Sequence, residues 1–372
     1  MFSNQRYYRI HRFLIFGLLL CGLLPVYGLA DTDPIDKLQP ARLELIDQSV
    51  LFGRVINIRG GKLTLATELI GEVEIDLTAI NRLESNGTVE LLMFDKTVVE
   101  TDSLQVANGE VMLDGLENFN LKEIYIANPE NWEKGVGYQV TGRVTSALHV
   151  NRGNTQIDKF DIYAESILES RQDRVTIRAN YEEAHSLVRA NINDTQSAET
   201  VPNEQTQTTV DNWHLIGKYD YFFKNPRNYL GVNLSYSVDE FADIGARAYL
   251  GPYFGRKLFT LDWLKLDAEL GLSYVDTDFL IAKDNSYAGL NLNLTGESNF
   301  FDGAFKLYLR QISIVNLTEF GESLYKTTIG LSFPLLTGLE AAAEISADYD
   351  GGAADRKDKL DQTYRFRVGY TW

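Results

Sequence analysis

The chain has 372 residues, of which 52 are acidic and 35 basic, so its formal net charge is −17. This acidic balance argues against a nucleic-acid partner, because phosphate backbones are bound by clustered Lys and Arg. Cys21 is the single cysteine, which excludes an internal disulfide and cysteine-based metal sites.

The first 30 residues predict a secretory signal peptide. Three basic residues open the chain: Arg6, Arg9 and Arg12. An apolar run over residues 13–24 follows, and the small residues Gly28 and Ala30 stand at positions −3 and −1 of a cleavage site after residue 30. The competing interpretation is a transmembrane anchor, but the apolar run is shorter than the roughly 20 residues that a spanning helix needs. Removal of residues 1–30 leaves 32 basic (35 minus 3) and 52 acidic residues, a net charge of −20.

Residues 31–135 contain an internal repeat. The segment DQSVL from Asp47 recurs as DKTVV from Asp95, and GKLTL from Gly61 recurs as GEVML from Gly109, both 48 residues later. Each copy is a set of short strands joined by tight turns. We expect two small SH3-like β-modules packed on each other, lying in the periplasm and available to a periplasmic or cell-wall partner.

Residues 136–372 have a different pattern, a series of twelve runs in which every second residue is apolar. The run Leu266, Ala268, Leu270 and Leu272 is typical. In a strand this alternation gives one apolar and one polar face. The pattern predicts an all-β fold whose main part is a twelve-stranded antiparallel transmembrane β-barrel, apolar toward lipid and polar toward its lumen. A soluble protein built of repeated sandwiches would also explain the alternation.

The termini of the barrel segment favour the membrane interpretation. The last strand alternates from Tyr364 to Trp372, and an aromatic residue at the end of such a strand is typical of barrels presented to the outer-membrane insertion machinery. Expected turns on one side are short, whereas polar loops over 191–209 and 350–359 are expected on the other, the asymmetry of outer-membrane barrels. We therefore expect the barrel in the bacterial outer membrane, in contact with its lipid.

Several short blocks, in order, resemble one bacterial family. They are Arg152-Gly-Asn-Thr, Tyr219-Asp-Tyr-Phe-Phe, the block from Ile244 to Gly255, and the ending Asp361…Tyr370-Thr-Trp. Together they resemble the salt-induced outer membrane protein family, the domain of unknown function 481 group. The resemblance implies an outer-membrane barrel over about residues 132–372 and implies no activity for any particular residue.

Charged residues at alternate positions of the expected strands predict a polar lumen with nearly balanced charge. The candidates for lining it are Arg143, Asp161, Arg174, Arg178, Arg247, Glu269, Arg310, Glu340, Glu344, Arg365 and Arg367. Two interpretations stay open: a lumen closed by ion pairs, or a narrow solute pathway. Pairing of Arg365 and Arg367 with carboxylates such as Glu340 and Glu344 on the preceding strand would seal the barrel.

The chain offers little material for catalysis, so we expect a non-enzymatic envelope protein without cofactor or metal: a narrow pore, or an anchor for an interaction module. The histidines His149, His185 and His214 do not form a close pair of the kind that zinc sites use. The alternative hypothesis is an outer-membrane hydrolase acting on lipid or peptide, with His149 or His214 as the base.

Overall fold

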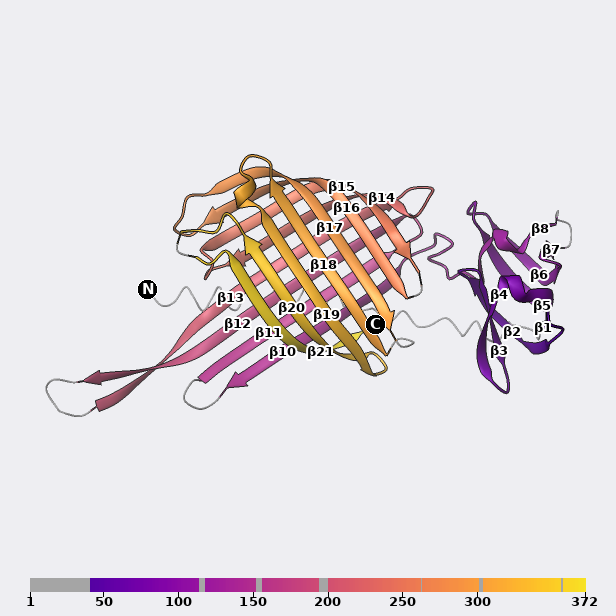
Figure 1. The fold of residues 1–372 in the computed structure, drawn as a ribbon, viewed down its shortest axis with the longest axis horizontal. Helices are drawn as coiled ribbons and strands as arrows, with labels where there is room; N and C mark the ends of the chain where they lie inside the picture. The colour runs from indigo at the N-terminus through magenta and orange to yellow at the C-terminus, as the bar shows by residue number, and fades with distance from the viewer. Residues whose placement is uncertain are drawn as a thin grey trace. The chain divides into compact units, whose positions relative to one another are not determined.

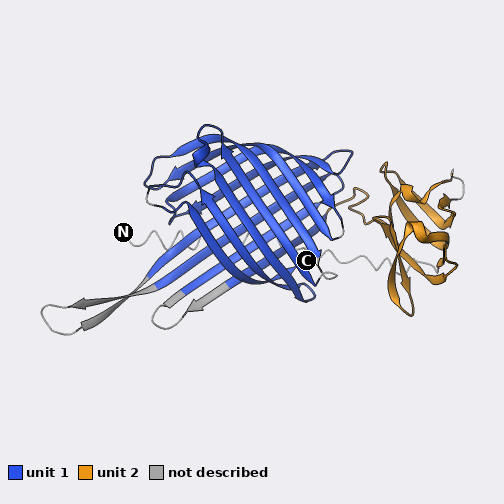
Figure 2. Ribbon diagram, in the orientation of Figure 1, with its two compact units in different colours: residues 1–25, 139–372 blue, residues 26–138 orange. Residues whose placement is uncertain are grey.

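The computed structural model describes residues 41–113, 118–151, 156–193, 200–261, 263–300, 304–355 and 357–372. The predicted signal peptide, residues 1–30, and the turn that begins at Arg152 lie outside these residues. The chain divides into two compact units after Tyr138 (Figure 2), where the sequence placed the boundary after residue 135. Each unit is described by itself.

The described residues of the N-terminal unit form a β-structure with two one-turn 3-10 helices (Figure 1). Its elements are β1 (Ala41–Leu45), β2 (Val50–Arg59), β3 (Lys62–Thr67), β4 (Gly71–Asp76), η2 (Leu77–Ala79), β5 (Ile80–Met93), β6 (Val98–Ala107), β7 (Glu110–Met112), β8 (Phe119–Asn120), η3 (Leu121–Glu123) and β9 (Ile124–Ala127). The strand order is β4-β3-β2-β1-β5-β6-β7-β8, and β9 pairs with both β2 and β5.

The sequence repeat appears as a repeat of structure. Three strands, a 3-10 turn and a closing strand (β2, β3, β4, η2, β5) are followed by the same succession (β6, β7, β8, η3, β9), an SH3-like order. The turns before β2 and β6 use the same device: the Ser49 amide donates to Asp47 Oδ1 and the Thr97 amide to Asp95 Oδ1, both at 2.9 Å. Equivalent short polar residues therefore fix equivalent turns in both copies.

One strand, β5, belongs to both copies. Its first half pairs with β1 (Leu43↔Leu83), and its second half pairs with β9 (Leu91↔Ala127). The ladder to β6 shifts register between Asn86 and Val89, where Gly87 has a φ of 124°. A residue with a side chain rarely adopts that φ, so glycine permits the bend between the two halves.

An apolar core holds the N-terminal unit together. The largest fully buried side chains in it come from β1, β2, β3, β5, β6 and η3: Leu43, Val55, Ile58, Leu63, Leu65, Leu83, Leu91, Leu104 and Leu121. Because both copies contribute to a single cluster, the unit has one shared core and not two separate ones.

The C-terminal unit is a closed antiparallel barrel of twelve strands, β10 to β21 in chain order (Figure 1). Its strands are β10 (Gln139–Asn151), β11 (Gln156–Glu169), β12 (Asp173–Asn193), β13 (Thr200–Phe222), β14 (Asn228–Asp239), β15 (Ile244–Thr260), β16 (Leu264–Phe279), β17 (Asn285–Phe300), β18 (Phe305–Asn316), β19 (Leu324–Leu336), β20 (Leu339–Asp350) and β21 (Leu360–Thr371). A short turn, η4 (Phe320–Glu322), precedes β19. The predicted fold class is confirmed.

Alternation along each strand separates the two faces of the barrel wall. On β14, Leu230, Val232 and Leu234 are exposed, whereas Tyr229 and Asn233 are buried. The exposed apolar positions lie on the outer surface and the polar positions point inward, as the period of two requires. Among the described residues no helix is long and apolar enough to cross a membrane.

One expected loop is largely strand. The polar stretch 191–209 was predicted as an outer loop, but the β12–β13 ladder continues to Asn193↔Thr200. A hairpin in water needs no apolar face to keep its backbone hydrogen bonds, and its Thr and Val residues favour extended backbone. The polar composition of residues 191–209 is therefore the reason that the sequence predicted a loop in place of this hairpin.

Candidate functional site

The two ends of the barrel differ in their connections. At the end where β10 begins and β21 ends, the strands are joined by short segments such as 170–172 and 337–338; we call this the turn end. The opposite, loop end carries longer connections such as 317–323 and 351–359. Polar side chains inside the barrel lie in layers between these ends.

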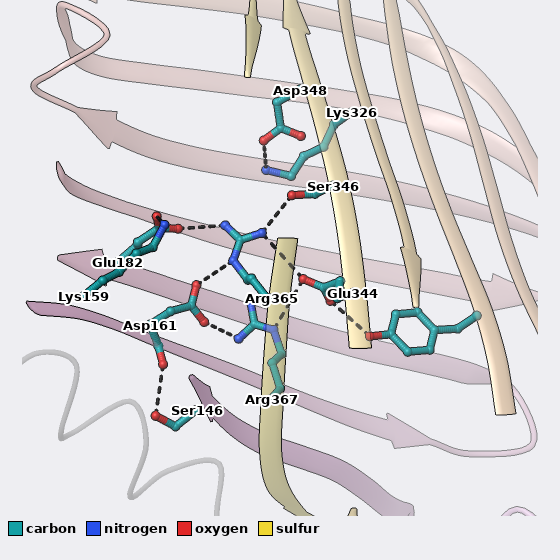
Figure 3. Close-up of polar contacts among 11 residues, drawn as sticks. Ser146, Lys159, Asp161, Glu182, Lys326, Glu344, Ser346, Asp348, Arg365 and Arg367 are labelled. Carbon is teal, nitrogen blue, oxygen red and sulfur yellow. Dashed lines mark hydrogen bonds and ion pairs between the residues drawn. The ribbon is translucent and has the colours of Figure 1, made fainter. Parts of the chain in front are cut away.

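Arg365 and Arg367 of β21 form the centre of the first layer, which we call the seam cluster: Lys159, Asp161, Glu182, Glu344, Arg365 and Arg367. Figure 3 shows both guanidinium groups reaching from β21 to Asp161 on β11. Arg365 binds Asp161 at 3.1 Å and Glu182 at 2.7 Å, and Arg367 binds the other oxygen of Asp161. Only β10 separates β21 from β11 in the closed barrel, so these contacts pass over the inner face of β10.

Carboxylates of the seam cluster each have more than one partner. Glu344 lies 3.4 Å from Arg367 and accepts from the Tyr308 hydroxyl at 3.1 Å. Glu182 also binds Lys159 at 2.6 Å. Several partners are needed here because taking an ion out of water costs several kcal/mol, which a single ion pair does not reliably offset.

A second layer surrounds Glu165 of β11. Three arginines from three strands converge on its carboxylate: Arg143 at 3.3 Å, Arg310 at 3.2 Å, and Arg178. The Tyr163 ring lies 5.2 Å from the Arg143 guanidinium and 5.3 Å from that of Arg310. The three guanidinium groups share the one negative charge of Glu165, and the cation–π contacts with Tyr163 add to their stabilisation.

The turn end holds a third layer, the turn-end cluster: Arg174, Lys218, Asp220, Tyr229, Tyr253, Asp267 and Glu269. Arg174 binds Asp220 at 2.8 Å, and Lys218 binds Glu269 at 2.6 Å across the interior. The Tyr229 hydroxyl donates to Glu269 at 3.0 Å, and that of Tyr253 donates to Asp220. Tyr229 and Asp220 are 0% exposed and Tyr253 is 2% exposed, so these side chains are shielded from solvent.

The remaining residues that the sequence singled out take part in other pairs. Arg247 binds Asp350 at 2.7 Å toward the loop end. Glu344 meets both Arg365 and Arg367, as the sequence proposed, whereas Glu340 lies 3.9 Å from Arg143. The structure thus distributes the eleven predicted residues over several layers of one interior.

Sequence reasoning missed the tyrosines of these layers and the glycines that make room for them. A Cβ on Gly231 would lie 2.4 Å from the Tyr253 ring, and one on Gly255 would lie 2.1 Å from the ring of Tyr229. Gly330 stands in the same relation to Tyr308, at 2.1 Å. The available signal was a tyrosine at an inward position of one strand opposite a glycine on the next.

The loop-end half of the interior is open. A cavity of about 700 Å³ is lined by residues of the wall and loops, including His214, Asp239, Lys326 and Asp361, and by Arg365 and Arg367 of the seam cluster. No residue of the turn-end cluster lines it. The barrel interior is therefore a polar cup that opens toward the loop end, with ion pairs beneath it.

Of the two candidate catalytic histidines, the structure describes the side chain of one. The side chain of His149 lies outside what the structure describes, whereas His214 lines the cup with its Nε2 2.7 Å from Ser235 Oγ. Among the described residues no group of three or more His, Cys, Asp or Glu side chains is arranged to hold a metal ion.

Comparison with known sequences identifies one family. The model of the family described as "Protein of unknown function, DUF481" matches residues 144–372, which confirms the resemblance read from the sequence. That description does not mention salt induction. No curated protein matches the chain.

Solved outer-membrane proteins are similar to this chain at low identity. The COG4313 outer membrane channel from Pseudomonas putida F1 is 8% identical, over 64% of this chain and 96% of that chain, with a TM-score of 0.36. The translocator domain of autotransporter NalP from Neisseria meningitidis is 12% identical, over 64% of this chain and 88% of that one, with a TM-score of 0.35.

Proposed function

This chain belongs to the DUF481 family, and we propose that it is a non-enzymatic outer-membrane protein: a barrel closed to solutes that anchors a periplasmic interaction module. The membrane location is supported by the apolar outer wall, where strand after strand exposes Leu, Val and aromatic side chains. An apolar surface of that extent needs a lipid or protein partner. The amphipathic strand β21, ending next to Trp372, suits the insertion machinery expected from the sequence.

The observation that carries the closed state is the burial of the turn-end cluster. Asp220, Tyr229 and Tyr253 are buried inside the barrel, next to the ion pairs Arg174–Asp220 and Lys218–Glu269. A conducting filter leaves charged side chains hydrated along a continuous path. Charged groups that pair with one another across the lumen instead hold the wall together.

Conductance in planar lipid bilayers tests this proposal. We expect the purified, folded protein to produce no unitary conductance steps. A variant with Tyr229→Ala and Tyr253→Ala, which empties the turn end, is expected to produce them. Heat-modifiable electrophoretic mobility verifies that both barrels are folded. Steps from the wild-type protein would contradict the closed state and favour the narrow solute pathway.

The N-terminal unit is the part that we assign to partner binding, with a periplasmic protein or the cell wall as the partner. Its hairpin tip exposes Leu69 by 97% and Ile70 by 66%, and Phe94 and Tyr125 form an exposed ring pair at 5.2 Å. We expect full-length protein in detergent to retain one envelope component that a variant with Leu69→Ser and Ile70→Ser loses. Equal retention of every component by both proteins would count against this assignment.

A second function, hydrolysis, is favoured by one distance, that between His214 Nε2 and Ser235 Oγ (2.7 Å). A serine nucleophile needs a base at this distance, and both side chains line the cup. Its test is hydrolysis of phospholipid and peptide substrates by wild type and Ser235→Ala. Activity that the substitution abolishes would support the enzyme, and activity that it leaves intact would remove this site.

A further inference from the structure

The seam that closes the barrel is paired over only part of its length. The β10–β21 ladder consists of the pairs from Arg143↔Thr371 to Ser146↔Val368. Both strands continue toward the loop end, β10 to Asn151 and β21 back to Leu360. Over this stretch β10 remains paired to β11 and β21 to β20, but the described residues form no ladder between β10 and β21.

The unpaired part of β21 lies within the apolar wall. Its outward side chains Tyr364 and Phe366 are 72% and 67% exposed. At membrane depth no water is available to the backbone, so strand edges there pair with other strands or meet other polar groups. We call the stretch between β10 and β21 beyond the pair Ser146↔Val368, toward the loop end, the upper seam. It needs a partner that brings hydrogen-bonding groups to this depth.

Cations lie directly inside the upper seam. Arg365 and Arg367 line the cup, and so does Lys159 on the far side of β10. Their ion pairs with Asp161 and Glu182 pass behind β10 and connect β21 to β11 and β12 (Figure 3). Guanidinium groups bind phosphate through the same paired N–H donors that they use for carboxylates.

An apolar groove lies outside the wall next to the same strand. It has a volume of about 550 Å³ and is lined by residues of β18 to β21, among them Leu307, Ile329, Leu331, Tyr364 and Phe366. Its floor includes Ala343, whose small side chain leaves room for the hollow. Arg365 and Glu344 contribute to both the outer groove and the inner cup.

We propose that the upper β10–β21 seam binds a phosphate-bearing membrane lipid, with the headgroup inside at Arg365 and Arg367 and an acyl chain in the outer groove. A polar cup, an apolar groove and a gap between two strands match the polar and apolar parts of one amphiphile. The headgroup phosphate takes a share of the guanidinium contacts now made by Asp161 and Glu182. This inference rests on the proposed membrane location and adds a ligand to it.

Disulfide cross-linking in outer-membrane vesicles tests the gap itself. If the register continued, Leu148 would stand opposite Phe366, two residues beyond the last pair, so Leu148→Cys with Phe366→Cys is the test variant. Ser146→Cys with Val368→Cys, at the last observed pair, is the matched control. We expect the control to cross-link at least about tenfold faster, because cross-strand pairs meet the distance that a disulfide requires. Equal rates would overturn the open seam.

Photolabelling tests the ligand in the full-length protein. The probe is phosphatidylglycerol with a diazirine in one acyl chain, and we expect label on β21 and the groove strands. Unlabelled phosphatidylglycerol should compete, whereas diacylglycerol, which lacks the phosphate, and free glycerol phosphate, which lacks the chains, should not. Competition by diacylglycerol would overturn the headgroup assignment, and competition by glycerol phosphate would mean a site for free phosphate only.

Variants separate the lipid site from general effects on the barrel. Arg365→Gln with Arg367→Gln is expected to reduce labelling about tenfold, since both guanidinium groups are lost, whereas Arg174→Gln at the turn end leaves it unchanged. Equal loss in both variants would overturn the assigned site. Failure of the protein to fractionate with outer membranes would contradict the proposed location, whatever the cross-linking shows.

Discussion

The N-terminal unit and the barrel are both β-structures, yet side chains of opposite polarity form their interiors. The core of the first is mainly Leu, Ile and Val, whereas the buried residues of the second include many Asp, Glu, Ser, Thr, Asn and Tyr side chains. The difference depends on whether the apolar environment lies inside the β-structure, as in a core, or outside it, as in lipid. A unit in water buries its apolar side chains, whereas a barrel in lipid exposes them and must satisfy the polar ones internally.

Substitutions should therefore reduce the stability of the two units in different ways. An apolar core loses stability in proportion to the volume removed and tolerates repacking. A paired interior loses most when one partner is deleted, because the other is left charged and buried. Four variants test this contrast between the two interiors, in order of decreasing expected loss of stability.

Asp161→Leu deletes the carboxylate that binds both Arg365 and Arg367. We expect it to destabilise the barrel by about 3–5 kcal/mol, because two buried guanidinium groups lose a partner. Urea unfolding in detergent, followed by electrophoretic mobility, measures the change. Lys326→Met breaks a half-exposed pair with Asp348 and should cost at most about 1 kcal/mol. Equal losses would mean that burial does not set the strength of these pairs.

Leu91→Ala removes a fully buried side chain from the core of the N-terminal unit. The expected loss is about 2–4 kcal/mol, from the lost burial and the cavity left behind. The thermal transition of this unit should fall while the barrel transition is unchanged. Phe94→Ala, at an exposed position, serves as the control. A similar drop for Phe94→Ala would show that the buried core is not what stabilises the unit.

Gly231→Ala places a methyl group 2.4 Å from the Tyr253 ring and 2.7 Å from Asp220 Oδ1. We expect the barrel to lose about 1–3 kcal/mol, since the ring has to move. Gly217→Ala is the matched control, because nothing lies within 4 Å of its added Cβ. The urea midpoint of the barrel reports both. If the two variants behave alike, the tyrosine–glycine contact is dispensable.

Asp76→Asn tests a charge at the surface of the N-terminal unit. Hydrogen bonds from the Thr78 side chain and amide lower the pKa of Asp76 below its ordinary value of 3.8. A carboxylate with a lowered folded pKa stabilises the fold above its ordinary pKa, and this contribution is lost as the pH falls through the folded pKa. Asp76→Asn should therefore lower the melting temperature slightly at neutral pH, and the difference should vanish in acid. A difference that persists at low pH would point to a lost hydrogen bond instead.

Strand positions and facing could be predicted from the sequence because alternation is local. The exposed Leu230, Val232 and Leu234 alternate as a lipid-facing strand must. The repeat was likewise visible, since Asp47 and Asp95 keep the residue type that their turns need.

Partners across the barrel could not be predicted in the same way. They depend on strand tilt and stagger, which set the height at which side chains of non-adjacent strands meet inside the barrel. Arg365 therefore pairs with Glu182, nine strands earlier in the chain, a contact that no spacing along the sequence encodes. The place where the β10–β21 ladder stops is equally non-local.

The shared strand β5 has a consequence for how the N-terminal unit melts. Each copy takes one of its strands from the same continuous segment, Ile80–Met93. Neither copy can come apart without pulling a strand out of the other, so we expect a single cooperative transition and no half-unfolded intermediate. For the same reason, deletion of either copy together with β5 removes a strand on which the other copy depends. The two repeated modules therefore fold and unfold as a single unit.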